Sequence, residues 1–296
     1  MKMHDFLKDI IYILRPDHWI KNLLVLAPPF FGGVLFTNSG MFLKMFLAFI
    51  AFSLASSTAY IVNDISDIKS DRLHPKKKLR PLTSGRISVT TASVLAIVTL
   101  ALSLSASFKI GTYFLILTIS YLALSLSYSF YLQKIEIIDV FCIAIGFVLR
   151  IEAGGVASAI EVSNWLLLTT FLLSLLLAFG KRRHELIMHN ESENSFREVL
   201  SRYNTKFLDT TLSIFATTAI VTYAIYTVDI ESRKLLFTVP FAIYGVLRYM
   251  YLVQTDTRGD PTESLLKDRP LFLCVLTWFL ITAAVIYFKD IVGFFK

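Results

Sequence analysis

The sequence predicts an all-α, polytopic membrane protein with about nine transmembrane helices. Hydrophobic residues make up 55% of its 296 residues and charged residues 17%, which is less charge than soluble domains carry. The apolar residues gather in several runs near the roughly 20 residues that a helix needs to cross a bilayer. The runs lack the alternation, over about ten residues, that is typical of transmembrane β-strands. These observations exclude a soluble globular domain.

The apolar runs are expected to form one membrane domain over residues 1–296, because no linker or second domain is evident. No signal peptide is expected, since the first run leads into a second one rather than into a cleavage site. The first run contains Pro28-Pro29 and Gly32-Gly33, so we expect it to kink or break. The expected spans are residues 19–36, 41–63, 88–107, 110–131, 137–157, 164–180, 207–228, 234–253 and 270–289.

The distribution of basic residues predicts the orientation. With a cytoplasmic N-terminus, 21 of the 29 lysines and arginines fall on the cytoplasmic side and 6 on the other, in agreement with the positive-inside rule. The sequence therefore predicts an inner-membrane protein with its charged loops, and its chemistry, on the cytoplasmic face. The net charge of +7 suits phosphate-rich substrates and an anionic leaflet, whereas nucleic-acid binding is not expected because the basic residues flank membrane spans. Cys142 and Cys274 are expected to be core residues.

An acidic segment follows the second expected span. Asn63, Asp67 and Asp71 are spaced i, i+4 and i+8, and Asp64 shares their face if the segment is helical. Carboxylates stacked in this way repel one another unless a cation lies among them. Mg²⁺ takes oxygen ligands from a few carboxylates and from substrate phosphates. The spacing therefore predicts a metal site for a diphosphate.

A basic segment comes next, after a break expected at His74-Pro75. Such residues bind phosphate. An alternative is that they only mark the cytoplasmic side of the membrane, which explains the cations but not the three aspartates. The segment contains Lys76, Lys77, Lys78, Arg80 and Arg86.

Two further groups of polar residues adjoin the apolar runs. Asp139, Gly146 and Arg150 share one helix face, with Tyr128 and Lys134 at the same end, and are either a functional group or an Asp–Arg pair that joins helices. Lys181, Arg182 and Glu185 follow the sixth span and are either part of the site or a solvated cluster. Lys181 and Glu185 have the i, i+4 spacing of an ion pair. A zinc site at His184 and His189 is not expected.

Asn63-Asp64-x-x-Asp67-x-x-x-Asp71 with Arg80-Pro81-Leu82-x-Ser84-Gly85 resembles the first signature of the UbiA superfamily of intramembrane prenyltransferases. The resemblance covers nearly the whole chain. It implies nine helices around a central cavity, capped by cytoplasmic loops, with Mg²⁺ between aspartates and a diphosphate.

The chain departs from quinone-making members, which carry a second aspartate-rich motif where this chain has Lys181-Arg182-Arg183-His184-Glu185. With Arg15-Pro16-x-x-Trp19-x-Lys21-Asn22 and Gly146-Phe147-x-Leu149-Arg150-x-x-Ala153-Gly154-Gly155, it is similar to the decaprenyl-phosphate phosphoribosyltransferase branch. The branch implies transfer of 5-phosphoribose from phosphoribosyl diphosphate (PRPP) to a polyprenyl phosphate. Basic residues in the second motif suit the additional phosphates of these substrates.

The resemblance also implies roles for individual residues. Asp64, Asp67 and Asp71 are expected to hold Mg²⁺ and the diphosphate, which Asn63 positions. The expected substrate-binding residues are Arg15, Lys21, Lys76, Lys78, Arg80, Tyr128, Lys134, Asp139, Arg150, Lys181, Arg182 and Glu185.

Two other functions remain open at this point. The chain could be a prenyltransferase for an aromatic or haem acceptor, but that function is typically accompanied by a second aspartate-rich motif. A transporter or channel predicts ionisable residues at the membrane midplane. Here only Arg150 and Arg248 lie clearly deeper than the expected cytoplasmic face.

Overall fold

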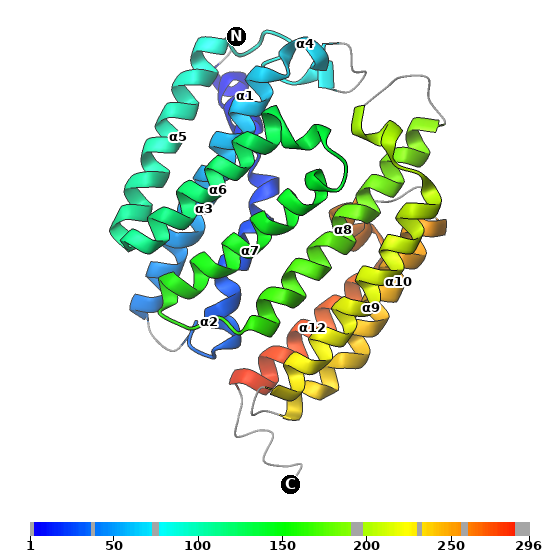
Figure 1. The fold of residues 1–296 in the computed structure, drawn as a ribbon. Helices are drawn as coiled ribbons and strands as arrows, with labels where there is room; N and C mark the ends of the chain where they lie inside the picture. Colours follow the sequence, from blue (N-terminus) through cyan, green and yellow to red (C-terminus); the bar gives the residue numbers. More distant parts are fainter. Residues whose placement is uncertain are drawn as a thin grey trace. The chain divides into compact units, whose positions relative to one another are not determined.

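The structure, a computed structural model, describes residues 3–36, 39–72, 77–190, 198–229, 233–255 and 260–287. These residues form helices and loops and contain no β-strand (Figure 1). Eight of the helices are long and apolar enough to cross a membrane, so the all-α, multi-pass class is confirmed. They are α3 (Ser39–Ser66), α5 (Val89–Ile110), α6 (Thr112–Phe130), α7 (Ile138–Ser158), α8 (Asn164–Asn190), α9 (Thr205–Asp229), α10 (Val239–Thr255) and α12 (Arg269–Tyr287).

The first expected span is not a regular transmembrane helix, so the count of nine is not confirmed. Residues Pro16–Leu26 form the 3-10 helix η1, and Ala27–Phe31 form the short α-helix α2. Proline lacks a backbone N–H, and Pro28-Pro29 is tolerated here because it lies in the first turn of α2. The expected break in this segment is confirmed.

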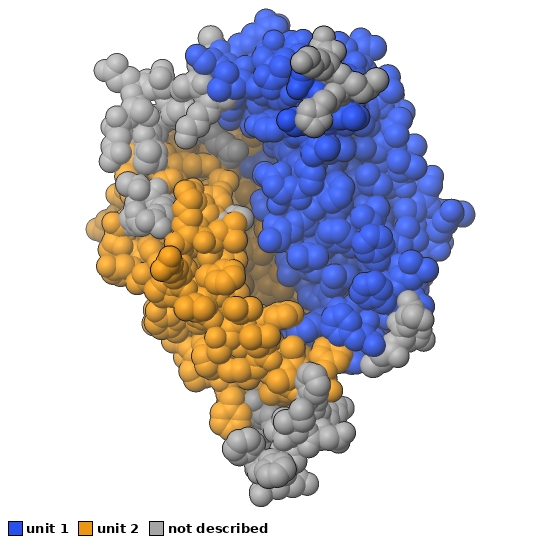
Figure 2. Space-filling view, turned by 180° about the vertical axis from the view of Figure 1, so that it is seen from behind, with its two compact units in different colours: residues 1–132, 149–161 blue, residues 133–148, 162–296 orange. Residues whose placement is uncertain are grey.

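The chain divides into two compact units, coloured separately in Figure 2. Unit 1 comprises residues 1–132 and 149–161, and unit 2 comprises residues 133–148 and 162–296. Helix α7 therefore contributes its beginning to unit 2 and its end to unit 1. The single membrane domain expected over residues 1–296 stays a prediction.

Unit 1 is built around α3, which contacts α5, α6 and η1. Ala48, Ala51 and Ala55 of α3 are completely buried, because small side chains let neighbouring helices approach closely. The amphipathic helix α1 (Met3–Leu14) covers one end of α3 and packs on a core beside the acidic segment. That core contains Ile13, Ile61, Leu82, Ile87, Ala92 and Ala96.

Gly154 lets η1 pack directly against α7 within unit 1. A Cβ atom at this position would overlap the backbone carbonyl of Val25 and touch Pro28. Any side chain would therefore push the two backbones apart. Gly154, in the Ala153-Gly154-Gly155 segment, thus has a packing role.

Unit 2 consists mainly of α8, α9, α10 and α12, and α8 packs extensively on α9. Leu175, Leu176 and Phe179 of α8 are buried in its core, against Leu208 and Leu212 of α9. Near them, Gly180 leaves space for the Tyr249 hydroxyl, which donates a hydrogen bond to the Leu177 carbonyl at 3.1 Å.

Candidate active site

The acidic segment of unit 1 is helical, as its spacing predicts. Asn63 and Asp64 lie in the last turn of α3, and α4 (Ile68–Asp71) continues almost without a break. The backbone N–H groups of Asp67 and Asp71 donate to the carbonyls of Asn63 and Asp67 at 2.9 and 2.8 Å. The Asn63 amide also donates to Asp67 Oδ2 at 2.9 Å. The predicted shared face is confirmed for Asp64 and Asp71, because one side chain, Arg80, contacts both.

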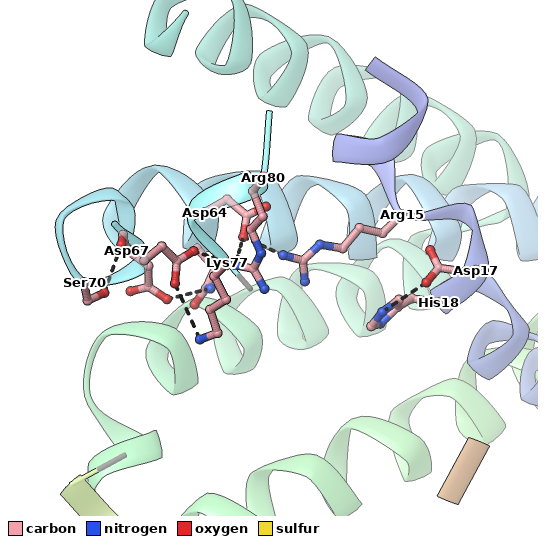
Figure 3. A network of polar contacts seen from close by, with 10 residues as sticks. Arg15, Asp17, His18, Asp64, Asp67, Ser70, Lys77 and Arg80 are labelled. Atoms are coloured by element: carbon pink, nitrogen blue, oxygen red, sulfur yellow. Dashed lines mark hydrogen bonds and ion pairs between the residues drawn. The ribbon is translucent and has the colours of Figure 1, made fainter. Parts of the chain in front are cut away.

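Three basic side chains surround these carboxylates (Figure 3). Arg80 Nη1 lies 3.0 Å from Asp64 Oδ1 and 2.6 Å from Asp71 Oδ2, so one nitrogen bridges two carboxylates. Arg15 Nη2 lies 2.5 Å from the same Oδ1 atom of Asp64. Lys77 Nζ lies 3.5 Å from Asp71 Oδ1. Asp64 and Asp71 are buried, so their charges are balanced within the protein rather than by water.

A folded turn positions Arg80. The backbone carbonyl of Arg80 accepts a hydrogen bond from the Ser84 N–H at 2.9 Å. Gly85 has a φ of 79°, in the left-handed region that favours glycine. Buried Leu82 and Ile87 fix the turn in the core. The segment from Arg80 to Gly85 therefore holds the Arg80 side chain in a fixed position.

Arg15 reaches the aspartates from the junction of α1 and η1. It has a φ of 52°, an uncommon left-handed conformation for a residue with a side chain. Its guanidinium lies 5.0 Å from the ring centre of Tyr60, a cation–π distance. Ser57 fixes the junction because its hydroxyl donates to the Leu14 carbonyl at 2.7 Å and accepts from Trp19 Nε1 at 3.0 Å. Strain at such a residue is typical of a functional position.

The donor chemistry of the acidic segment fits a hard divalent cation. Asp64, Asp67 and Asp71 supply carboxylate oxygens, the ligands that Mg²⁺ prefers. Burial raises the pKa of Asp67 and the nearby Asp71 carboxylate raises it further, whereas Lys77 and the Asn63 hydrogen bond lower it. Within the described part of the chain, no three acidic, histidine or cysteine side chains converge as a metal site. Asp64 Oδ1 and Asp71 Oδ2 instead accept hydrogen bonds from arginine nitrogens.

Arg150 lies in a second polar group of unit 1. Its side chain is 5% exposed; Nε donates to Asn22 Oδ1 at 2.7 Å and Nη2 to the Tyr121 hydroxyl at 3.0 Å. Asn22 also contacts Ser53 and Ser56 of α3. Arg150 thus joins η1, α3, α6 and α7.

Asp139 lies in unit 2 and pairs with Arg182. Arg182 is 1% exposed; its Nε donates to Asp139 Oδ2 and its Nη1 to Glu185 Oε2, both at 2.6 Å. The structure shows the ion pair that joins helices, with Arg182 as the partner of Asp139, and the functional interpretation of Asp139 stays a prediction. The structure gives Glu185 an i, i+3 contact to Arg182, whereas the spacing suggested Lys181.

Tyr203 completes this buried group. Its hydroxyl donates to Asp139 Oδ1 at 2.8 Å and accepts from the Ile137 backbone N–H at 2.6 Å. Burial raises the pKa of Tyr203, so the hydroxyl stays protonated and can donate. Ile137 has a φ of 68°, a strained value for a β-branched residue. Tyr203 thereby holds the bend that leads from Lys134 into α7.

The other basic residues of α8 also have partners. Lys181 Nζ lies 2.8 Å from Asp260 Oδ2, and both side chains remain partly exposed. Arg183 pairs with Asp209 and donates to the Val253 carbonyl at 2.6 Å, in the last turn of α10. Cations are favourable at this end of a helix.

The remaining predicted residues differ in exposure. Lys78 and Lys134 are exposed, and Lys21 and Tyr128 are partly buried. Lys76 lies outside the described residues. Three partners of predicted site residues are seen only in the structure: Lys77, Tyr203 and Asp260. Lys77 lies in the basic segment, but no local signal links Tyr203 or Asp260 to the site, since each acts across a long stretch of chain.

The fold and the site thus define a multi-pass helical membrane protein in which buried carboxylates pair with arginines at the end of α3. Residues 26–273 match the model of the UbiA prenyltransferase family. The chain therefore belongs to the UbiA prenyltransferase family.

Relatives and solved structures agree with this assignment. The chain is 34% identical over 288 residues to a decaprenyl-phosphate phosphoribosyltransferase of Corynebacterium glutamicum, covering 94% of this chain and 86% of the relative. A protein of the same name from Mycolicibacterium smegmatis is 33% identical over 301 residues, 96% of this chain and 94% of the relative. The fold is similar to that of a UbiA homologue from Archaeoglobus fulgidus, solved with DMAPP and Mg²⁺, with a TM-score of 0.74 and 21% identity over 94% and 99% of the two chains.

Proposed function

We propose that this protein transfers 5-phosphoribose from PRPP to a polyprenyl phosphate in an Mg²⁺-dependent reaction. The observation that carries the proposal is the combination of the acidic segment with the basic Lys181–Glu185 segment, in a chain similar over nearly its whole length to decaprenyl-phosphate phosphoribosyltransferases. A prenyl diphosphate carries a single charged head group. PRPP carries a diphosphate and a separate 5-phosphate, and the acceptor adds a third anionic group.

In this proposal Asp64, Asp67 and Asp71 would hold the metal ion, which when bound would supply positive charge to offset that of the leaving diphosphate. Asn63 positions Asp67 through their hydrogen bond. Arg15 and Arg80 then bind the diphosphate oxygens, since guanidinium groups match phosphate as well as carboxylate.

The chemistry is a substitution at the ribose carbon that carries the diphosphate. A phosphate oxygen of the lipid forms the new bond to this carbon, and the bond from the carbon to the diphosphate oxygen breaks with its electron pair. The second pKa of such a phosphate is about 6, so it is largely a dianion at neutral pH and needs no general base. Positioning and charge stabilisation supply the catalysis.

The roles of the other residues follow from their exposure. Lys78, Lys134 and Lys181 keep exposed surface and are proposed to bind substrate phosphates, together with Lys21, Lys76 and Tyr128. Asp139, Arg150, Arg182 and Glu185 are also proposed to bind substrate, and in the structure they form the hydrogen bonds and ion pairs described above. The charge distribution supports an inner-membrane location with a cytoplasmic N-terminus and a reaction on the cytoplasmic face.

The experiment that tests this proposal compares donors. Purified protein in lipid nanodiscs is incubated with Mg²⁺, polyprenyl phosphate and PRPP, and the lipid is analysed by mass spectrometry. We expect a product heavier than the acceptor by one phosphoribosyl group. Attachment of a prenyl group from a prenyl diphosphate to an aromatic acid, without phosphoribosyl transfer, would contradict the proposal and leave only the family assignment.

A further inference from the structure

Arg80 lies where its charge competes with a metal ion. Asp64 and Asp71 are two helical turns apart on one face, and each already accepts from Arg80 Nη1 with one of its two oxygens, so a divalent cation joining them would lie beside this guanidinium. Arg15 donates to the same Asp64 oxygen as Arg80 does. These contacts leave Asp64 Oδ1 with two guanidinium donors, 2.5 and 3.0 Å away.

The charges within this group balance. Three carboxylates, Asp64, Asp67 and Asp71, face three cations, Arg15, Lys77 and Arg80. A divalent cation alone would add a double positive charge to a half-buried group that is already neutral, next to two guanidinium groups. A diphosphate alone would bring several negative charges beside three carboxylates. Each ligand by itself is therefore disfavoured by charge.

The two ligands together remove both penalties. Phosphate oxygens accept from guanidinium groups in the geometry that carboxylates use. When a diphosphate is present, Arg15 and Arg80 have new acceptors, and the released carboxylate oxygens become available to the cation. The side chains can make this change because both remain partly exposed, Arg15 at 16% and Arg80 at 20%.

We propose that Arg15 and Arg80 are exchangeable counter-ions that close the acidic segment in the free enzyme and move to the donor diphosphate when the metal binds. This inference rests on the proposed function, because the diphosphate in it is that of the proposed donor substrate. Its consequence is that metal and diphosphate bind cooperatively, whereas the metal alone binds weakly. A coupling of about tenfold or more is typical for two ligands linked in this way.

The test measures binding of Mn²⁺ alone, by electron paramagnetic resonance, and of inorganic diphosphate at saturating Mg²⁺, by calorimetry. In Arg80→Gln, Mn²⁺ should bind about tenfold more tightly than in the wild type, and diphosphate about tenfold more weakly. A residue that only binds phosphate would change the second affinity and leave the first unchanged. The control is Arg202→Gln, because Arg202 forms an exposed ion pair with Glu136 and belongs to neither the acidic nor the basic segment, and both affinities should stay as in the wild type.

Two further variants keep the test decisive. Arg15→Gln removes one guanidinium from Asp64 and should shift both affinities in the same directions as Arg80→Gln. Arg80→Met also removes the charge, with a flexible side chain of similar length, and serves if Arg80→Gln does not fold; Mn²⁺ should bind more tightly to it as well. Unchanged or weaker Mn²⁺ binding in the folded variants would overturn the exchange. Phosphoribosyl transfer by the wild type would still stand in that case, so the two proposals fail separately.

Discussion

Arg80 Nη1 donates a 3.0 Å hydrogen bond to Oδ1 of Asp64, a residue 16 positions earlier in the chain. The contact joins the two halves of the sequence signature, since Asp64 belongs to the acidic segment and Arg80 to the basic one. Neither half is a complete site without the other. Several consequences can be measured.

The aspartates are expected to be needed for the reaction rather than for folding. Asp64→Asn and Asp67→Asn should each lower the turnover number by about 100-fold or more, because the lost charge weakens stabilisation of the leaving diphosphate. Turnover is measured at saturating Mg²⁺, alongside thermal unfolding. Asp17→Asn is the control, because Asp17 lies nearby but is 76% exposed, and it should keep wild-type activity. Normal turnover in both site variants would mean that the aspartates are structural.

Lys181 is expected to contribute to donor binding. Its side chain is 41% exposed and forms an ion pair with Asp260, which is also partly exposed, so the ammonium group can turn to a phosphate. Lys181→Ala should raise the dissociation constant of PRPP about tenfold and leave the Mg²⁺ dependence intact. Calorimetric titration of PRPP provides the measurement, and Lys267→Ala, in an exposed pair with Glu263, is the control. Equal affinities in Lys181→Ala and the wild type would remove Lys181 from the binding site.

Tyr203 is expected to stabilise unit 2. Tyr203→Phe removes the donor to buried Asp139 and leaves the strained Ile137 N–H without its acceptor, at a cost of about 1–3 kcal/mol. The midpoint of thermal unfolding should fall accordingly. Tyr131→Phe is the comparison, since Tyr131 is 74% exposed, and its midpoint should match that of the wild type. A midpoint unchanged by Tyr203→Phe would show that the hydroxyl contributes nothing.

Two glycines in helix interiors are expected to respond in opposite ways to alanine. Gly154→Ala should destabilise the protein by about 1–3 kcal/mol, because the new Cβ overlaps the Val25 carbonyl. Gly245→Ala should be neutral or slightly stabilising, because its Cβ meets only Cys274 Sγ at 3.8 Å, and alanine favours helix. Unfolding of both variants is followed under the same detergent conditions. Equal stabilities would refute the close packing of η1 on α7.

The orientation is expected to place the acidic segment on the cytoplasmic side. Lys78 and Lys109 are both exposed, and α5 separates them by about 30 Å of helix. In a variant whose Cys142 and Cys274 are replaced, a cysteine at position 78 should resist a membrane-impermeant reagent added to intact cells. A cysteine at position 109 should be labelled. The reverse pattern would invert the topology.

The sequence was sufficient for the features that depend on local periodicity. Apolar runs of about 20 residues predicted the membrane helices, and the i, i+4 and i+8 spacing of Asn63, Asp67 and Asp71 predicted their common face. Helical geometry fixes both relationships within a few turns, so no distant contact is required. The break in the first expected span was also predictable, from Pro28-Pro29.

The tertiary structure decided which charges meet. Arg15 pairs with Asp64 across 49 positions, and Arg182 pairs with Asp139 across 43. The only partner that helix spacing suggested for a cation was Glu185 for Lys181, and Glu185 contacts Arg182 instead. Packing decides such pairs, because a buried charge takes whichever opposite charge the fold brings to it. The same reasoning applies to Gly154, whose role depends on the carbonyl of Val25 from a different helix. The sequence by itself thus determined the helices and the chemical character of the site, and packing decided which cation neutralises each carboxylate.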